Sequence, residues 1–172
     1  MNDYQRIAIV GSPGSGKSTL ARKLGAITSL PVIHLDMEFW RPNWEMTPQD
    51  EWIQRQTKLM QTPQWIIDGN YGSTMEIRFA AADLVIFLDI GRAKCLSRVF
   101  KRLKMKRPDF PDFLKQKLDK EFFALCKFIW DYRKVSRVSV LQLHRQYSDK
   151  PFITIHNNRE LRHILEEFGE IY

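Results

Sequence analysis

The sequence contains little cysteine, few histidines and no long apolar run. Its two cysteines, Cys95 and Cys126, lie far apart and lack the spacing of a metal site, so we expect reduced, packed thiols. The four histidines are scattered singly and form no metal motif. No apolar stretch approaches the roughly 18 residues of a membrane span, and the first residues lack the pattern of a signal peptide. These absences predict a cytoplasmic protein without a membrane segment.

What the chain does contain is the composition of a globular domain. It has 172 residues, of which 44% are hydrophobic and 27% are charged. A chain of this size can bury one large core. No repeat, linker or low-complexity tract divides it. We therefore expect a single domain over residues 1–172, while the oligomeric state does not follow from the sequence.

Positive charge is concentrated in one part of the chain. The formal net charge is +7, and residues 92–107 contain basic side chains without a single acid. Such a local excess is typical of a site for a polyanion, which is either a nucleotide or a nucleic acid. No helix-turn-helix or zinc motif that reads DNA is present. The basic residues of this stretch are Arg92, Lys94, Arg98, Lys101, Arg102, Lys104, Lys106 and Arg107.

Residues 11–18 match the phosphate-binding pattern G-x-x-x-x-G-K-[ST] in its required context. An apolar segment at 6–10 predicts a strand before it, and the residues from Thr19 predict a helix after it. In this arrangement backbone N–H groups and the helix N-terminus bind phosphates, Lys17 contacts the β- and γ-phosphates, and the Ser18 hydroxyl binds Mg²⁺. We therefore predict an ATP and Mg²⁺ site. The predicted nucleotide-binding residues are Gly11, Ser12, Pro13, Gly14, Ser15, Gly16, Lys17, Ser18 and Thr19.

Short apolar segments alternate with helical patterns along the whole chain. The predicted strands are 6–10, 32–35, 65–68, 84–89 and 152–155. Strands that are apolar throughout are typical of a parallel sheet covered on both faces. We expect an α/β fold with a five-stranded parallel sheet and helices on both faces, of the P-loop NTPase kind found in nucleoside kinases.

Acidic residues follow two of the predicted strands. Ligands of such sheets bind beyond the carboxyl ends of the strands. Asp68 ends the third predicted strand, where we expect it to hold Mg²⁺ through water opposite Ser18. Asp36 follows the second strand, and we expect it to bind the second substrate together with Arg41. Asp36 would either accept the proton of an alcohol or orient the acceptor.

The segment 39–44 is dense in aromatic residues around Arg41. Aromatic side chains can stack on a flat ring, and an arginine can bind an anion in bidentate fashion. The alternative is that Phe39, Trp40 and Trp44 fill a small satellite core. The sequence leaves both interpretations open.

A basic helix and a basic loop are predicted after the fourth strand. Arg98 and Arg102 lie four residues apart and therefore share one helix face. The polar, proline-containing segment 104–112 predicts a short lid. We expect Arg98, Arg102 and Arg107 to surround the phosphoryl group during its transfer and to act with Lys17 in catalysis.

The order of these parts resembles that of the adenylate-kinase-like P-loop kinases. Asp68-Gly69 is similar to the start of their D-G-F-P-R motif, but the chain continues with Asn70, so the motif's arginine is absent. The resemblance implies a nucleotide-dependent phosphotransferase. Binding of a monophosphate acceptor would need a substitute arginine, for which Arg41 and Arg78 are the candidates.

A closer resemblance is to the bacterial proteins called DNA topology modulation proteins, of the FlaR type. The segments that carry it are His34–Asp36, Trp40–Pro42, Trp65–Tyr71 and Phe128–Tyr132. The name of that family records a phenotype, and it implies an association with DNA without defining a reaction.

Two functions are therefore weighed. The first is an ATP- and Mg²⁺-dependent kinase for an unidentified small-molecule acceptor. The second is a nucleotide-binding regulator or ATPase switch that associates with DNA. The sequence favours the kinase, because a phosphate site is evident and a DNA-reading motif is not. The acceptor and the choice between ATP and GTP stay open.

Overall fold

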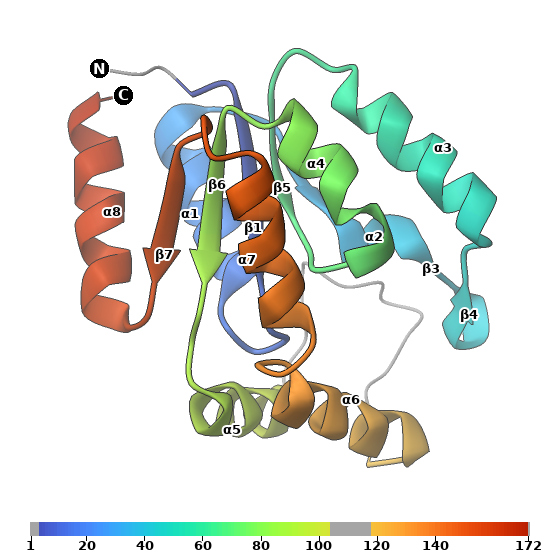
Figure 1. Ribbon diagram of the computed structural model, residues 1–172. Coiled ribbons are helices and arrows are strands. Elements are labelled where there is room, and N and C mark those ends of the chain that lie inside the picture. Colours follow the sequence, from blue (N-terminus) through green and yellow to red (C-terminus); the bar gives the residue numbers. More distant parts are fainter. Residues whose placement is uncertain (1–3, 104–117, 172) are drawn as a thin grey trace.

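The computed structural model describes residues 4–103 and 118–171 and contains a five-stranded parallel sheet (Figure 1). The strand order is β2-β5-β1-β6-β7, with every neighbouring pair parallel. Each strand lies where an apolar segment predicts one, so the predicted sheet is confirmed. The strands are β1 (Arg6–Gly11), β2 (Val32–His34), β5 (Trp65–Asp68), β6 (Leu84–Leu88) and β7 (Phe152–Ile155).

Helices connect the strands and cover both faces of the sheet. They are α1 (Lys17–Thr28), α2 (Leu35–Phe39), α3 (Gln49–Met60), α4 (Met75–Ala81), α5 (Arg92–Arg102), α6 (Lys120–Asp131), α7 (Ser136–Gln146) and α8 (Asn158–Ile171). Figure 1 shows α7 in front of the sheet and α1 behind it. The predicted α/β class is therefore confirmed.

The two faces of the sheet bury two separate cores because side chains alternate along a strand. In β1, Ile7 and Ile9 pack with α1, α5, α6 and α8, whereas Ala8 and Val10 pack with α3, α4 and α7. All four of these side chains are fully buried. Burial on both faces explains why the strand sequences are apolar throughout.

The carboxyl ends of the strands meet at one edge of the sheet. Figure 1 shows α5 and α6 lying across that edge, beyond the tips of the strand arrows. The P-loop leaves β1 at the same edge, and the residues that follow β2 and β5 begin there too. Parallel strands thus bring segments that are distant in the sequence to one place.

Two parts of the chain differ from a simple strand and helix alternation. The aromatic segment after α2 is a small antiparallel hairpin of β3 (Trp40–Arg41) and β4 (Glu45–Met46), joined by the 3₁₀ turn η1 (Pro42–Trp44). A second 3₁₀ turn, η2 (Gly72–Thr74), precedes α4.

The predicted lid at 104–112 lies outside the described residues. Among the helices of residues 4–103 and 118–171, none combines the length and apolar character needed to cross a bilayer.

Candidate active site

The P-loop between β1 and α1 depends on glycine at two close approaches. Gly14 has φ 79°, and a Cβ there would lie 2.4 Å from the carbonyl oxygen of Cys95 in α5. Gly11 has φ 148°, and a Cβ there would lie 2.7 Å from the carbonyl oxygen of Leu88 in β6. Both the positive φ and the contact exclude a larger residue. The loop is therefore held tightly between β6 and α5.

The N-terminus of α1 has the features of an anion site. No acidic residue lies in its first turn, and no side chain caps it. A helix of 12 residues presents backbone N–H groups and the positive end of its dipole at this point. A phosphate group bound there would meet no competing carboxylate from the helix itself.

The Lys17 side chain folds back over the P-loop. Its Nζ atom donates hydrogen bonds to the carbonyl oxygens of Gly11 and Ser12, both at 3.0 Å. Burial lowers the pKa of Lys17 below its ordinary value, and the carboxylates of Asp68 and Asp36 oppose that shift. The side chain is thus desolvated and poised beside the place where phosphates would lie.

Asp68 and His34 form a pair at the ends of neighbouring strands. The two residues are opposite each other in the β2 and β5 register, and His34 Nδ1 lies 2.8 Å from Asp68 Oδ2. Asp68 is buried. The imidazole therefore helps to fix the orientation of the carboxylate. The sequence did not predict this partner, although His34 lies one residue before the end of its predicted strand and Asp68 ends the next, which is a usable signal.

Asp36 and Tyr71 form the second fixed carboxylate of the site. The Tyr71 hydroxyl donates a hydrogen bond of 2.7 Å to Asp36 Oδ1. Burial raises the pKa of Tyr71 well above its ordinary value, and the neighbouring Asp36 charge raises it further. Tyr71 therefore stays protonated and acts as a permanent donor to Asp36. This contact joins α2 to the segment after β5.

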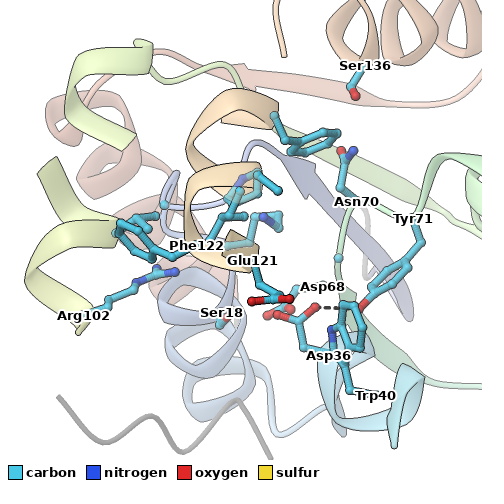
Figure 2. Close-up of a pocket in the computed structure, with 18 of the residues that line it drawn as sticks. Ser18, Asp36, Trp40, Asp68, Asn70, Tyr71, Arg102, Glu121, Phe122 and Ser136 are labelled. Carbon is cyan, nitrogen blue, oxygen red and sulfur yellow. Dashed lines mark hydrogen bonds between the residues drawn. The ribbon is translucent and has the colours of Figure 1, made fainter. Parts of the chain in front are cut away.

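These groups surround one pocket of about 780 Å³. In the view of Figure 2, Arg102 lies on one side, Tyr71, Asp36 and Trp40 lie on the other, and Ser18 lies between them. The lining residues come from the P-loop and α1 (Pro13, Gly14, Gly16, Lys17, Ser18), from α2 to β4 (Asp36, Trp40, Trp44, Met46), from the end of β5 onward (Asp68, Gly69, Asn70, Tyr71, Gly72), from α5 (Val99, Arg102) and from the region of α6 and α7 (Asp119, Glu121, Phe122, Ala124, Leu125, Phe128, Ser136).

The predicted nucleotide-binding residues divide into two groups. Pro13, Gly14, Gly16, Lys17 and Ser18 line the pocket. Gly11, Ser12 and Ser15 belong to the same loop without lining it, and Thr19 is exposed on α1. The wall formed by α6 was not predicted at all, because nothing in its sequence distinguishes a pocket wall from an ordinary amphipathic helix.

The structure directs Arg41 away from the pocket. Its guanidinium donates a hydrogen bond to Glu51 of α3, and Arg41 is absent from the pocket lining. The described side chain therefore lies outside the pocket wall, while its expected role in binding the acceptor stays a prediction. The physical reason is that β3 turns this side chain toward an acid that lies ten residues further along the chain.

Arg78 is equally unable to replace the missing motif arginine. It is 1% exposed and donates hydrogen bonds to Gln56 Oε1 at 2.8 Å and to the Asn70 carbonyl at 3.0 Å. Burial lowers the pKa of Arg78 to about 10. The guanidinium holds the backbone after β5 in place from behind the pocket, so it does not reach an acceptor.

The arginines of α5 have different partners despite their shared spacing. Arg98 donates to the carbonyl oxygens of Gly14 at 3.2 Å and Ser15 at 2.7 Å, and to Asn158 Oδ1 at 3.0 Å. Arg102 lines the pocket, whereas Arg98 does not. In this structure Arg98 braces the P-loop from outside, and its expected role at the phosphoryl group stays a prediction. Arg107 lies outside the described residues.

The aromatic segment contributes both to a small core and to the pocket wall. Phe39 packs inward, with ring centroids 5.0 Å from Trp52 and 4.7 Å from Tyr71. Trp40 and Trp44 pack edge to face at 5.4 Å and line the pocket. One aromatic residue therefore fills a satellite core, while two form part of the pocket wall.

The residues present fit a magnesium ion that is bound together with a nucleotide. Ser18 and Asp68 offer a hydroxyl and a carboxylate to the same pocket. Within residues 4–103 and 118–171, no group of three His, Cys, Asp or Glu side chains could hold a metal by itself. Mg²⁺ needs no such cage, because it commonly takes one or two carboxylates and completes its shell with phosphates and water.

Comparison with known proteins places the fold. No protein-family model matches the chain, and no curated protein matches it. Among solved structures it resembles shikimate kinase from Acinetobacter baumannii in complex with shikimate, with a TM-score of 0.57 and 15% identity over 97% of this chain and 92% of that one. It also resembles deoxyadenosine kinase from M. mycoides with bound dCTP, with a TM-score of 0.53 and 16% identity over 97% and 100% of the two chains. The chain therefore shares the fold of these two proteins.

Proposed function

We propose that the protein is an ATP- and Mg²⁺-dependent phosphotransferase that acts on a small-molecule acceptor. The observation that carries this proposal is one continuous pocket lined by P-loop residues, by the buried Asp68 and by Asp36. Phosphoryl transfer needs both substrates in line and the developing charge neutralised. A pocket that extends from the phosphate loop to a second fixed carboxylate has room for both.

The nucleotide half uses the P-loop and Lys17. Backbone N–H groups at the start of α1 would bind the phosphates, and Lys17 would exchange its two carbonyl partners for the β- and γ-phosphate oxygens. Negative phosphates favour the charged form of the lysine, so binding would reverse the lowering of its pKa by burial. Arg102 adds a second positive charge from α5.

Ser18 and Asp68 would hold Mg²⁺, Ser18 directly and Asp68 through water. When bound, the ion supplies positive charge to the phosphates and helps to align them. His34 keeps the Asp68 carboxylate in a single orientation through its 2.8 Å contact. Asn at position 68 would keep the shape of this side chain and remove its charge.

Asp36 is the candidate base of the acceptor half. The acceptor hydroxyl would lose its proton to the Asp36 carboxylate while its oxygen forms a bond to the γ-phosphorus. The bond from that phosphorus to the bridging oxygen breaks, and ADP leaves with that electron pair. Tyr71 orients Asp36 through the hydrogen bond to Oδ1, so the carboxylate is held in place before the acceptor binds.

The resemblance to topology modulation proteins stays a prediction, as does a cytoplasmic location. No contact of the basic stretch favours DNA, because several of its described side chains already have protein partners. Arg92 lies 4.0 Å over the ring of Trp130. Lys94 and Arg98 both donate to Asn158. These contacts account for part of the charge without a nucleic acid.

The test is phosphoryl transfer from ATP labelled in the γ position to a panel of nucleosides, nucleoside monophosphates and small alcohols. Label that appears in an acceptor, with much less released as phosphate, supports the kinase. Release of phosphate without transfer to any acceptor, and stimulated by DNA, would instead establish the ATPase switch. Omitting Mg²⁺ should abolish the transfer in the first case.

A further inference from the structure

The two halves of the pocket differ in charge. Of the described residues that line it, Lys17 and Arg102 are the ones with cationic side chains, and both belong to the half formed by the P-loop and α5. The described lining also contains four carboxylates: Asp68, which would hold Mg²⁺, Asp36 of the other half, and Asp119 and Glu121 at the start of α6. Once a nucleotide occupies the first half, its phosphates neutralise the positive charge of Lys17 and Arg102. The groups that remain in the second half for an acceptor are then mainly carboxylates and other oxygen atoms.

Arginines on the elements around the second half are already engaged with protein groups. Arg41 of β3 and Arg55 of α3 both donate to Glu51, and Arg55 also donates to the Glu38 carbonyl oxygen at 2.7 Å. Arg78 of α4 is buried against carbonyl oxygens. None of these three lines the pocket. Arginine is the side chain that most often recognises a phosphate or carboxylate on a ligand, and these three do not supply it to the wall.

Aromatic rings make up much of the remaining wall. Trp40 and Trp44 come from the hairpin, Tyr71 from the segment after β5 and Phe128 from α6. The rings of Tyr71 and Trp40 are held by Phe39, whose centroid is 4.7 Å from the first and 5.0 Å from the second. Rings that are fixed in this way provide a rigid apolar surface for a flat ligand.

We infer that the phosphoryl acceptor is a neutral or cationic hydroxyl compound with a flat ring, and that monophosphates and carboxylates are poor acceptors. This inference rests on the proposed function, since it describes the acceptor half of the same pocket. A hydroxyl or ammonium group can donate a charge-assisted hydrogen bond to Asp36. An anion in the same place would meet that carboxylate with no arginine from the described wall of this half to offset it.

The experiment measures acceptor binding separately from transfer. The protein is first saturated with Mg²⁺ and a non-hydrolysable ATP analogue, so that the nucleotide half is filled. Tryptophan fluorescence is then titrated with pyridoxic acid, pyridoxine and pyridoxamine, which share a ring and differ in the charge of one substituent. Thymidine and thymidine monophosphate form a second pair. Trp40 and Trp44 line the pocket and report the occupancy of this half.

We expect the neutral and cationic members to bind about ten- to a hundredfold more tightly than the anions, the scale of one hydrogen bond to a charged group. Asp36→Asn should remove about tenfold or more of that preference. Glu38→Gln is the matched control, because Glu38 lies on the same helix and outside the pocket lining. It should keep the preference.

The outcomes separate the inference from the function on which it rests. Equal or tighter binding of the anionic member in either series overturns the inference, and so does the absence of binding by every neutral and cationic member at millimolar concentration. Label transfer to thymidine monophosphate in preference to thymidine also overturns the inference, but it supports the proposed kinase activity. If the compounds bind with the expected preference but no reaction transfers label, the inferred charge preference of this half is supported and the proposed kinase activity is overturned.

Discussion

Two arginines on one helix should fail in different ways when they are removed. Arg98 braces the P-loop through the carbonyl oxygens of Gly14 and Ser15, whereas Arg102 lines the pocket. Arg98→Ala should therefore loosen the loop and lower stability and nucleotide affinity. Arg102→Ala should leave stability nearly unchanged, weaken nucleotide binding less than Arg98→Ala does, and lower kcat, because its charge would act on the reacting phosphate.

The size of the Arg98 effect follows from its contacts. A hydrogen bond to a charged group contributes roughly 1.5–3 kcal/mol, and the side chain is only half-buried, so we expect a loss of about 2 kcal/mol. For a chain of 172 residues this corresponds to a decrease in Tm of roughly 4–8 °C. Arg98→Lys should recover little, because an ammonium group cannot span the positions that the planar guanidinium contacts.

Thermal unfolding, nucleotide titration and steady-state kinetics on the two variants decide between the roles. The matched control is the exposed Lys101→Ala, on the same helix and outside the pocket lining. If Arg98→Ala keeps the parent Tm and nucleotide affinity but loses kcat, the brace is refuted and Arg98 acts on the phosphoryl group. An unchanged kcat in Arg102→Ala would remove that residue from the catalytic set.

Three further changes test the rest of the site. Lys17→Met should abolish transfer and weaken nucleotide binding, whereas the exposed Lys23→Met should do neither. Burial lowers the pKa of Lys17 in the free protein, and bound phosphates would raise it. The nucleotide affinity of the parent protein should therefore fall as the pH rises above that lowered pKa. The same pH dependence in Lys17→Met would contradict this assignment. Asp68→Asn should reduce kcat by roughly a hundredfold with a higher Mg²⁺ requirement; unchanged kinetics would make Asp68 structural. Arg78→Ala leaves Gln56 and the Asn70 carbonyl without their donor, and urea unfolding should show a loss of about 3 kcal/mol. A loss below about 1 kcal/mol would refute that role.

The sequence by itself determined the elements of the sheet and the phosphate loop. The central strands β1, β5 and β6 are buried on both faces, so each is a short apolar segment that stands out against its neighbours. The loop needs glycine for its backbone and Lys17 and Ser18 for its chemistry, and all of these lie within residues 11–18. Information of this kind is local, which is why a pattern of adjacent residues can carry it.

The tertiary structure alone decided which charged side chains line the pocket. Arg41 and Arg98 are typical anion-binding residues in sequence, yet one is paired with Glu51 and the other with the carbonyls of a loop more than eighty residues away. The partner of an arginine depends on which acids and carbonyls folding brings near, and sequence spacing does not record this.

The same holds for the acceptor half of the pocket. Asp36 is oriented by Tyr71, which is 35 residues further along the chain, and α6 closes the cavity from a segment that has no recognisable motif. These groups meet because parallel strands end at one edge of the sheet and helices pack across it. The sequence therefore predicted the candidate phosphate loop, whereas the packing of distant segments decided the charge and shape of the rest of the pocket.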